Sequence, residues 1–118
     1  MLEQFEINTI VPMVVETIDS KIGKSNAVKG HHIISWLLAC GHDINPGRFR
    51  LIINYIRSND LVIGLVANAR GYYRTDDPEE IQRWIDKEIG IIKQKAGPLK
   101  RMRIYLHELL NKPNLYAA

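Results

Sequence analysis

Three arginines and one asparagine lie between residues 46 and 58, and no acidic residue separates them. They are Arg48, Arg50, Asn54 and Arg57. Guanidinium groups bind phosphates and pair bidentately with guanine, and the amide of asparagine pairs in the same way with adenine. These residue types therefore indicate binding to a nucleic acid rather than the making or breaking of a bond.

Catalytic and metal-binding chemistry has weaker support. Cys40-Gly41-His42 resembles half of a zinc site, but no second ligand pair has zinc spacing, and Cys40 is expected on the buried side of a helix. Gly23-Lys24-Ser25 lacks the upstream glycine and strand of a nucleotide-binding loop. The acids after residue 75 cluster at a predicted helix start, where capping explains them. We predict a protein that is not an enzyme and holds no metal ion or cofactor.

Two helices joined by a tight turn would position the basic residues. The first is predicted over His31–Cys40, and Gly41 then ends it while Ile44 returns to the core. The second begins at Asn45-Pro46, an N-cap residue followed by the residue best tolerated at the first helical position, and continues to about Ser58. The first helix is expected inside a three-helix cluster, because it is apolar on most sides. Its apolar residues are Ile33, Ile34, Trp36, Leu37, Leu38 and Cys40.

The second helix has one apolar side and one polar side. Its expected buried stripe, at the i, i+3, i+4, i+7 spacing, is Phe49, Ile52, Ile53 and Ile56. The opposite side carries Gly47, Arg50, Leu51, Asn54 and Ser58, flanked by Arg48, Tyr55 and Arg57. If this helix enters a major groove, Arg50, Asn54, Gly47 and Ser58 face base edges, and Arg48 and Arg57 reach phosphates. Leu51 would suit a thymine methyl group.

A β-hairpin is predicted after the second helix. Two runs of β-forming residues, Leu61–Val66 and Gly71–Thr75, flank a short loop, and strand alternation turns one of the two tyrosines inward. Arg70 and Arg74 would lie on or beside this hairpin. His31, at the start of the first helix, is a further candidate for a contact with the DNA backbone.

A helix from Val11 to Ile22, with Pro12 in its first turn, would complete the core. Ala27-Val28 is a candidate short strand that pairs with the hairpin. The predicted fold is mainly α with a small β-hairpin, a winged helix-turn-helix over residues 1–75 with a C-terminal helical extension over 76–118.

The extension is predicted as two helical pieces. Asp77-Pro78 starts the first piece, Gly97-Pro98 interrupts or kinks the helix, and a second piece from Leu99 ends near Asn111. The first stripe is Ile81, Trp84, Ile85, Ile89, Ile92 and Ala96, and the second is Met102, Leu106, Leu109 and Leu110. The sequence leaves open whether these apolar stripes pack back on the first helix of the chain or join two copies. We favour a homodimer, because two copies read two DNA half-sites.

Charge is distributed unevenly around a formal net value of +3. The range from Lys29 to Arg74 contains six basic residues and two acids. The range from Thr75 to Ile92 contains six acids and two basic residues, and that from Lys93 to Arg103 contains five basic residues and no acid. This pattern favours a basic face on the helix-turn-helix and a second basic patch further along the chain.

Part of the chain resembles a known family. The carrying residues are Ile44, Arg48, Ile53, Ile56-Arg57, Gly71-Tyr72-Tyr73, Thr75 and Asp77-Pro78-Glu79-Glu80-Ile81. From about Ala27 to Leu106 they resemble the winged-helix domain of small phage and prophage proteins, including replication-type and origin-binding ones. Where that family usually has a cysteine- or serine-rich wing, this chain has the apolar residues 61–68. The resemblance implies a phage or prophage protein that binds double-stranded DNA, and it leaves transcriptional repression, replication and excision as alternatives.

Length and composition agree with one globular domain. The chain has 118 residues, of which 46% are hydrophobic and 25% charged. A single cysteine fits a reducing cytoplasm, here that of a bacterial host cell. The first seven residues include Glu3 and Glu6 where a signal peptide needs basic residues, and no stretch is long enough to span a membrane.

A second functional interpretation remains open at this point. Leu51 and Tyr55 on the exposed side of the helix over 45–58, together with the apolar hairpin, suit a module that binds a phage or host protein, for example as an inhibitor. DNA binding is the favoured interpretation.

Overall fold

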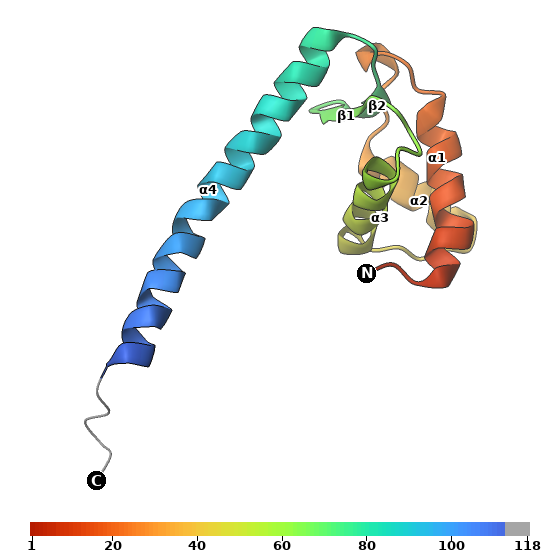
Figure 1. The fold of residues 1–118 in the computed structure, drawn as a ribbon. Coiled ribbons are helices and arrows are strands. Elements are labelled where there is room, and N and C mark those ends of the chain that lie inside the picture. The colour runs from red at the N-terminus through yellow and green to blue at the C-terminus, as the bar shows by residue number, and fades with distance from the viewer. Residues whose placement is uncertain (113–118) are drawn as a thin grey trace. The chain divides into compact units, whose positions relative to one another are not determined.

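The computed structural model describes residues 1–112 and divides into two units, Met1–Ile81 and a second that begins at Gln82 (Figure 1). The first unit contains η1 (Glu6–Ile10), α1 (Val11–Asp19), η2 (Lys24–Asn26), α2 (Gly30–Ala39), α3 (Pro46–Ser58), β1 (Leu65–Asn68) and β2 (Gly71–Arg74). The helix α4 (Pro78–Asn111) follows. The prediction of a mainly helical chain with one small hairpin is confirmed. The division lies in the first turn of α4, and the end of the predicted extension, 113–118, lies outside the described residues.

Helices α1, α2 and α3 supply most of the hydrophobic core, and the chain around the hairpin closes it. The four predicted stripe residues of α3 are all buried, and Ile44 is buried as predicted. The core residues are Ile10, Val11, Val14, Ile18, Ile33, Leu37, Ile44, Phe49, Ile52, Ile53, Ile56, Val62 and Leu65.

The first helical segment begins earlier and ends earlier than the predicted range 11–22. The chain is helical from Gln4, and the N–H of Val11 donates to the carbonyl of Glu6, five residues back, in the widened turn that precedes Pro12. Pro12 has no N–H to donate, so a widened turn next to it removes little hydrogen bonding. The helix ends at Asp19 because the following backbone pairs with the hairpin. The N–H of Arg74 donates to the carbonyl of Lys21 over 2.7 Å.

Helix α2 has the predicted position, but the prediction that it is buried on most sides was wrong. Ile33 and Leu37 are buried, whereas Trp36 is 42% exposed and Leu38 is 57% exposed. Cys40, predicted on the buried side, is also exposed. The reason is that a small three-helix core covers only one face of a ten-residue helix.

The hairpin is shorter than predicted. Its first strand begins at Leu65 rather than Leu61, and the register pairs Leu65 with Arg74 and Asn68 with Gly71. Val28 pairs with Tyr72 through two backbone hydrogen bonds of 2.9 and 2.7 Å, which confirms the predicted pairing of this segment with the hairpin. Tyr73 is buried, and Tyr72 lies edge-on to Phe49 with ring centroids 5.7 Å apart.

Helix α4 starts as predicted but is not interrupted. The Asp77 carboxylate accepts the N–H of Glu79 over 3.0 Å, and the helix then runs through Gly97-Pro98 to Asn111. Gly97 has no Cβ, so the usual clash between a proline ring and the preceding side chain is relieved. None of the helices within residues 1–112 is long and apolar enough to cross a membrane.

The start of α3 yields a prediction. The Asn45 side chain accepts the N–H of Arg48 over 2.8 Å. We expect Asn45→Ala to lower the free energy of unfolding by about 1 kcal/mol, because this N–H loses its partner. Chemical denaturation measures the change. Asn54→Ala, in the middle of the same helix and exposed, is the matched control and should change stability by less than about 0.5 kcal/mol. Equal losses in the two variants would contradict the capping role.

Candidate nucleic-acid interface

The outward side of α3 has the composition that the sequence predicts. Exposed residues are Gly47, Arg50, Leu51, Asn54 and Ser58, while the flanking Arg48, Tyr55 and Arg57 are half-buried. Arg50 and Asn54 are four residues apart, so they lie on the same face one turn from each other. This face presents one guanidinium and one amide to solvent from a rigid element.

Arg48 is held by an acid that the sequence analysis missed. Its Nε donates to one carboxylate oxygen of Glu6 over 3.0 Å, and its Nη2 donates to the other oxygen and to the Met1 carbonyl, the latter over 3.2 Å. Glu6 is only 5% exposed and also accepts the N–H of Glu3 over 2.9 Å. The guanidinium that was expected to reach a phosphate thus ties the first turn of α3 to the N-terminal helix.

The electrostatics of this pair follow from its geometry. The hydrogen bond from Arg48 lowers the pKa of the Glu6 carboxyl below its ordinary value of 4.5, although burial acts in the opposite direction. The hydrogen bond from Glu6 in turn raises the pKa of Arg48. A sequence signal for this pair exists. Glu6, Ile10, Val14 and Ile18 follow one another at intervals of four residues, so all four lie on the same buried side of the helical segment. Glu6 is the one acidic residue among these four.

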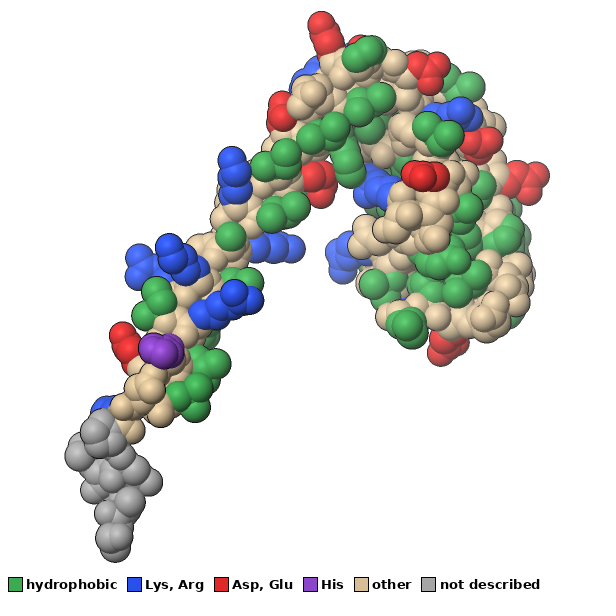
Figure 2. Space-filling view, in the orientation of Figure 1, with side chains coloured by type: hydrophobic (Ala, Val, Ile, Leu, Met, Phe, Trp, Pro, Cys, Tyr) green, Lys and Arg blue, Asp and Glu red, His purple; other side chains and the backbone are tan. Residues whose placement is uncertain are grey.

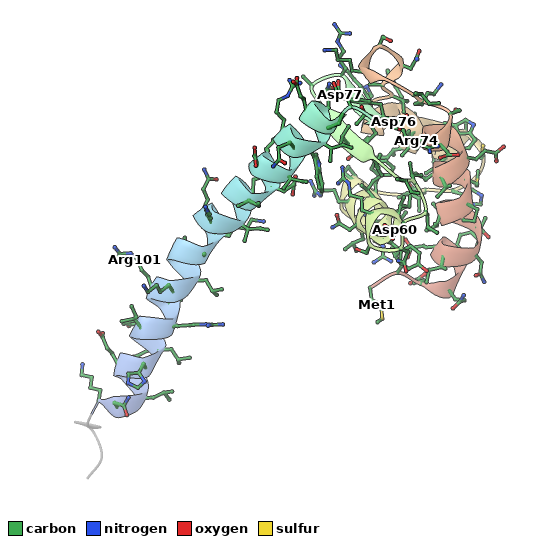
Figure 3. All side chains as sticks on the ribbon, turned by 45° about the horizontal axis from the view of Figure 1, so that its top comes forward. Met1, Asp60, Arg74, Asp76, Asp77 and Arg101 are labelled. Atoms are coloured by element: carbon green, nitrogen blue, oxygen red, sulfur yellow. The ribbon has the colours of Figure 1, made fainter. Side chains whose placement is uncertain are left out.

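The predicted residues of the hairpin differ in their surroundings. Arg74 donates from Nη1 to Asp19 over 3.0 Å and lies against α1 (Figure 3). Arg70 is exposed in the turn between β1 and β2, where its N–H donates to the Asn68 side chain over 2.8 Å. His31 is exposed at the start of α2, with its ring 4.3 Å from that of His32. Arg70 and His31 are therefore accessible side chains, and Arg74 is in an ion pair.

A groove of about 540 Å³ runs beside the outward side of α3. Its α3 side consists of Leu51, Asn54, Tyr55, Ser58 and the following Asn59. The opposite side consists of Met1, Leu2, Gln4 and Ile7. Leu51, Asn54 and Ser58 belong both to the lining of this groove and to the outward side of α3, so the groove adjoins the side that carries Arg50.

No three His, Cys, Asp or Glu side chains among residues 1–112 are grouped so that they could hold a metal ion. Near the turn after α2, the ring of His42 lies 5.6 Å from that of Phe5. Comparison with known proteins found no matching family model, no matching curated protein and no matching solved structure.

Proposed function

We propose that residues 1–75 form a winged helix-turn-helix that binds double-stranded DNA, with α3 in the major groove and the β1–β2 hairpin as the wing. The order of the elements supports this proposal, because a three-helix core is followed directly by a two-stranded hairpin. The isolated bridge between Val28 and Tyr72 lies where such domains have a short third strand. The resemblance to phage proteins suggests a regulatory or replication role in a bacterial cell.

The observation that carries the proposal is the outward side of α3. Arg50 and Asn54 extend from a helix with no acidic residue, and the buried stripe behind them fixes the orientation of the helix. Arg50 suits a bidentate contact to guanine and Asn54 one to adenine. Leu51 suits a thymine methyl group, and the exposed Gly47 and Ser58 would face base edges on the same side.

The other candidate residues take supporting roles in this proposal. Arg70 and His31 are exposed and would contact phosphates beside the major groove. Arg48 and Arg74 already have acidic partners, so a phosphate contact from either would compete with its ion pair. Arg57 is half-buried at the edge of the outward side. Base reading is therefore assigned mainly to Arg50 and Asn54.

Binding of the full chain to random duplex DNA, measured against salt concentration, tests this proposal. We expect the affinity of the native chain to fall steeply with salt. Sequences enriched from a random pool should bind Arg50→Ala about 10-fold more weakly, because one bidentate base contact discriminates by about 1 to 3 kcal/mol. Arg83→Ala on α4 makes the same charge change outside α3 and should keep the sequence preference. Absence of salt-sensitive binding at low ionic strength would overturn the proposal.

The groove beside α3 favours a second candidate function, a module that binds another protein. An apolar groove next to Leu51 and Tyr55 suits the apolar face of a partner helix. The two functions respond differently to substitution. Leu51→Glu should abolish binding of a protein partner by placing a charge in the groove, whereas Arg50→Ala should leave that binding intact. Capture of partners with both variants, followed by mass spectrometry, separates the two candidates.

A further inference from the structure

The middle of helix α4 carries five basic residues and no acid over residues 93–103. We call these five residues the α4 basic segment; they are Lys93, Lys95, Lys100, Arg101 and Arg103. All five are exposed, and within residues 1–112 none of them is in an ion pair. Figure 2 shows the Lys and Arg side chains gathered along the middle of α4. The segment is therefore a concentration of positive charge that is open to an anionic partner.

The helix itself gives these cations no acidic neighbour. Residues three and four apart lie next to each other on a helix, and none of the residues at these spacings from the α4 basic segment is acidic. Arg83, earlier on the same helix, differs, because Glu79 lies four residues before it and Asp86 three residues after it. Within the segment, Lys100 and Arg103 are three residues apart and repel each other. An anion beside the segment would offset this repulsion.

The directions of the cations indicate the shape of the anion. Lys93 and Lys100 are seven residues apart, close to two helical turns, so they lie on one side of α4. Arg101 extends away from the helix about 100° around from Lys100, and Lys95 lies about 200° around from Lys93 (Figure 3). A groove of duplex DNA has a phosphate backbone on each wall, whereas an anionic membrane offers its charges on one side only. Cations on several sides of the helix therefore favour duplex DNA over a lipid surface.

We propose that the α4 basic segment is a second DNA-contact site, which binds phosphates of duplex DNA without reading the base sequence. The identity of the polyanion as duplex DNA rests on the proposed function. The segment spans about 15 Å, and each DNA strand has one phosphate per about 3.4 Å of its axis, so the segment is long enough to meet several phosphates. Lys and Arg side chains that neutralise phosphates release the counterions of DNA. The segment thus adds affinity that depends on salt and not on base sequence.

Removal of two cations from the segment tests the inference in the full chain. Lys93→Gln combined with Lys100→Gln should lower the slope of log affinity against log salt concentration by about 2, because each phosphate contact contributes about 0.9. Affinity for random and for enriched duplexes should fall by the same factor, because phosphates carry no sequence information. Glutamine is a good helix former and both positions are exposed, so α4 should remain helical, which circular dichroism checks.

Arg83→Gln combined with Lys87→Gln is the matched control. This double variant removes the same charge from exposed positions of the same helix, outside the α4 basic segment. It should leave the salt slope nearly unchanged. Equal losses of slope in the two double variants would overturn the inference, because the effect would then follow the net charge of the chain and not the segment.

Failure of this inference and failure of the proposed function give different results. If Arg50→Ala removes the sequence preference while the Lys93→Gln, Lys100→Gln variant binds DNA like the native chain, α3 binds DNA and the inference is overturned. If that double variant lowers the salt slope while Arg50→Ala changes neither affinity nor preference, the inference stands and the assignment of base reading to α3 fails.

Vesicles of phosphatidylglycerol and phosphatidylcholine test the other polyanion. Ile92 and Leu99 expose apolar side chains on the same part of α4, and a helix with apolar and basic sides also suits a membrane surface. We expect the native chain to stay in the supernatant when such vesicles are sedimented at a salt concentration at which it binds duplex DNA. Sedimentation with the vesicles that is lost in the Lys93→Gln, Lys100→Gln variant, together with unchanged DNA binding by that variant, would overturn the inference in favour of a lipid surface.

Discussion

Gly71→Ala is expected to lower the free energy of unfolding of this protein by about 3 kcal/mol. Gly71 begins β2 with φ of +121°, a conformation that residues with a Cβ rarely adopt. An added Cβ would also overlap the carbonyl oxygen of Val28. That oxygen accepts the N–H of Tyr72 over 2.7 Å, so relief of the overlap would break the contact between the hairpin and the segment before α2. Denaturation followed by circular dichroism measures the loss.

Gly41→Ala is the matched control. Gly41 also has positive φ, +91°, in the left-handed turn that ends α2, but nothing lies within 4 Å of the Cβ that alanine would add. The substitution should therefore cost only the backbone term of about 1 kcal/mol. If the two variants lost the same stability, steric overlap at Val28 would not be the reason that position 71 needs glycine.

The stability of the protein should fall in acid as the Glu6–Arg48 pair is lost. The folded carboxyl has a pKa below the ordinary value of 4.5, because Arg48 stabilises the charged form. The contribution of Glu6 is therefore fully present above pH 4.5 and disappears as the pH falls through the folded pKa. In Glu6→Gln this part of the pH dependence should vanish. Thermal unfolding between pH 3 and pH 7 measures the difference between the two chains.

A double-mutant cycle separates the ion pair from the packing of the two side chains. Arg48→Met leaves a nearly buried carboxylate without its cation, so it should destabilise the protein more than the double variant Glu6→Gln, Arg48→Met does. Glu16→Gln on the same helical segment is exposed and serves as the control, with little change expected. A double variant less stable than Arg48→Met would show that the buried acid does not depend on the arginine.

Local patterns predicted most of the first unit correctly. The α3 range, its cap at Asn45 and its buried stripe were all readable, because capping and a 3.6-residue period are properties of neighbouring residues. The same reasoning located the turn at Gly41 and the start of α4 at Asp77-Pro78. The incorrect predictions concern the end of α1, the exposed side of α2 and the start of β1. At these places the structure depends on contacts between residues far apart in the sequence, or on the absence of such contacts.

The sequence by itself determined which side of α3 is apolar and which carries Arg50 and Asn54, since that division depends only on the order of residues along one helix. Only the tertiary structure decided which arginines remain available. Arg48 and Glu6 are 42 residues apart, and Arg74 and Asp19 are 55 apart, so no local pattern records that they meet. An ion pair forms when the packing of separate helices and strands brings two charges within a few ångströms, and that packing is a property of the whole core.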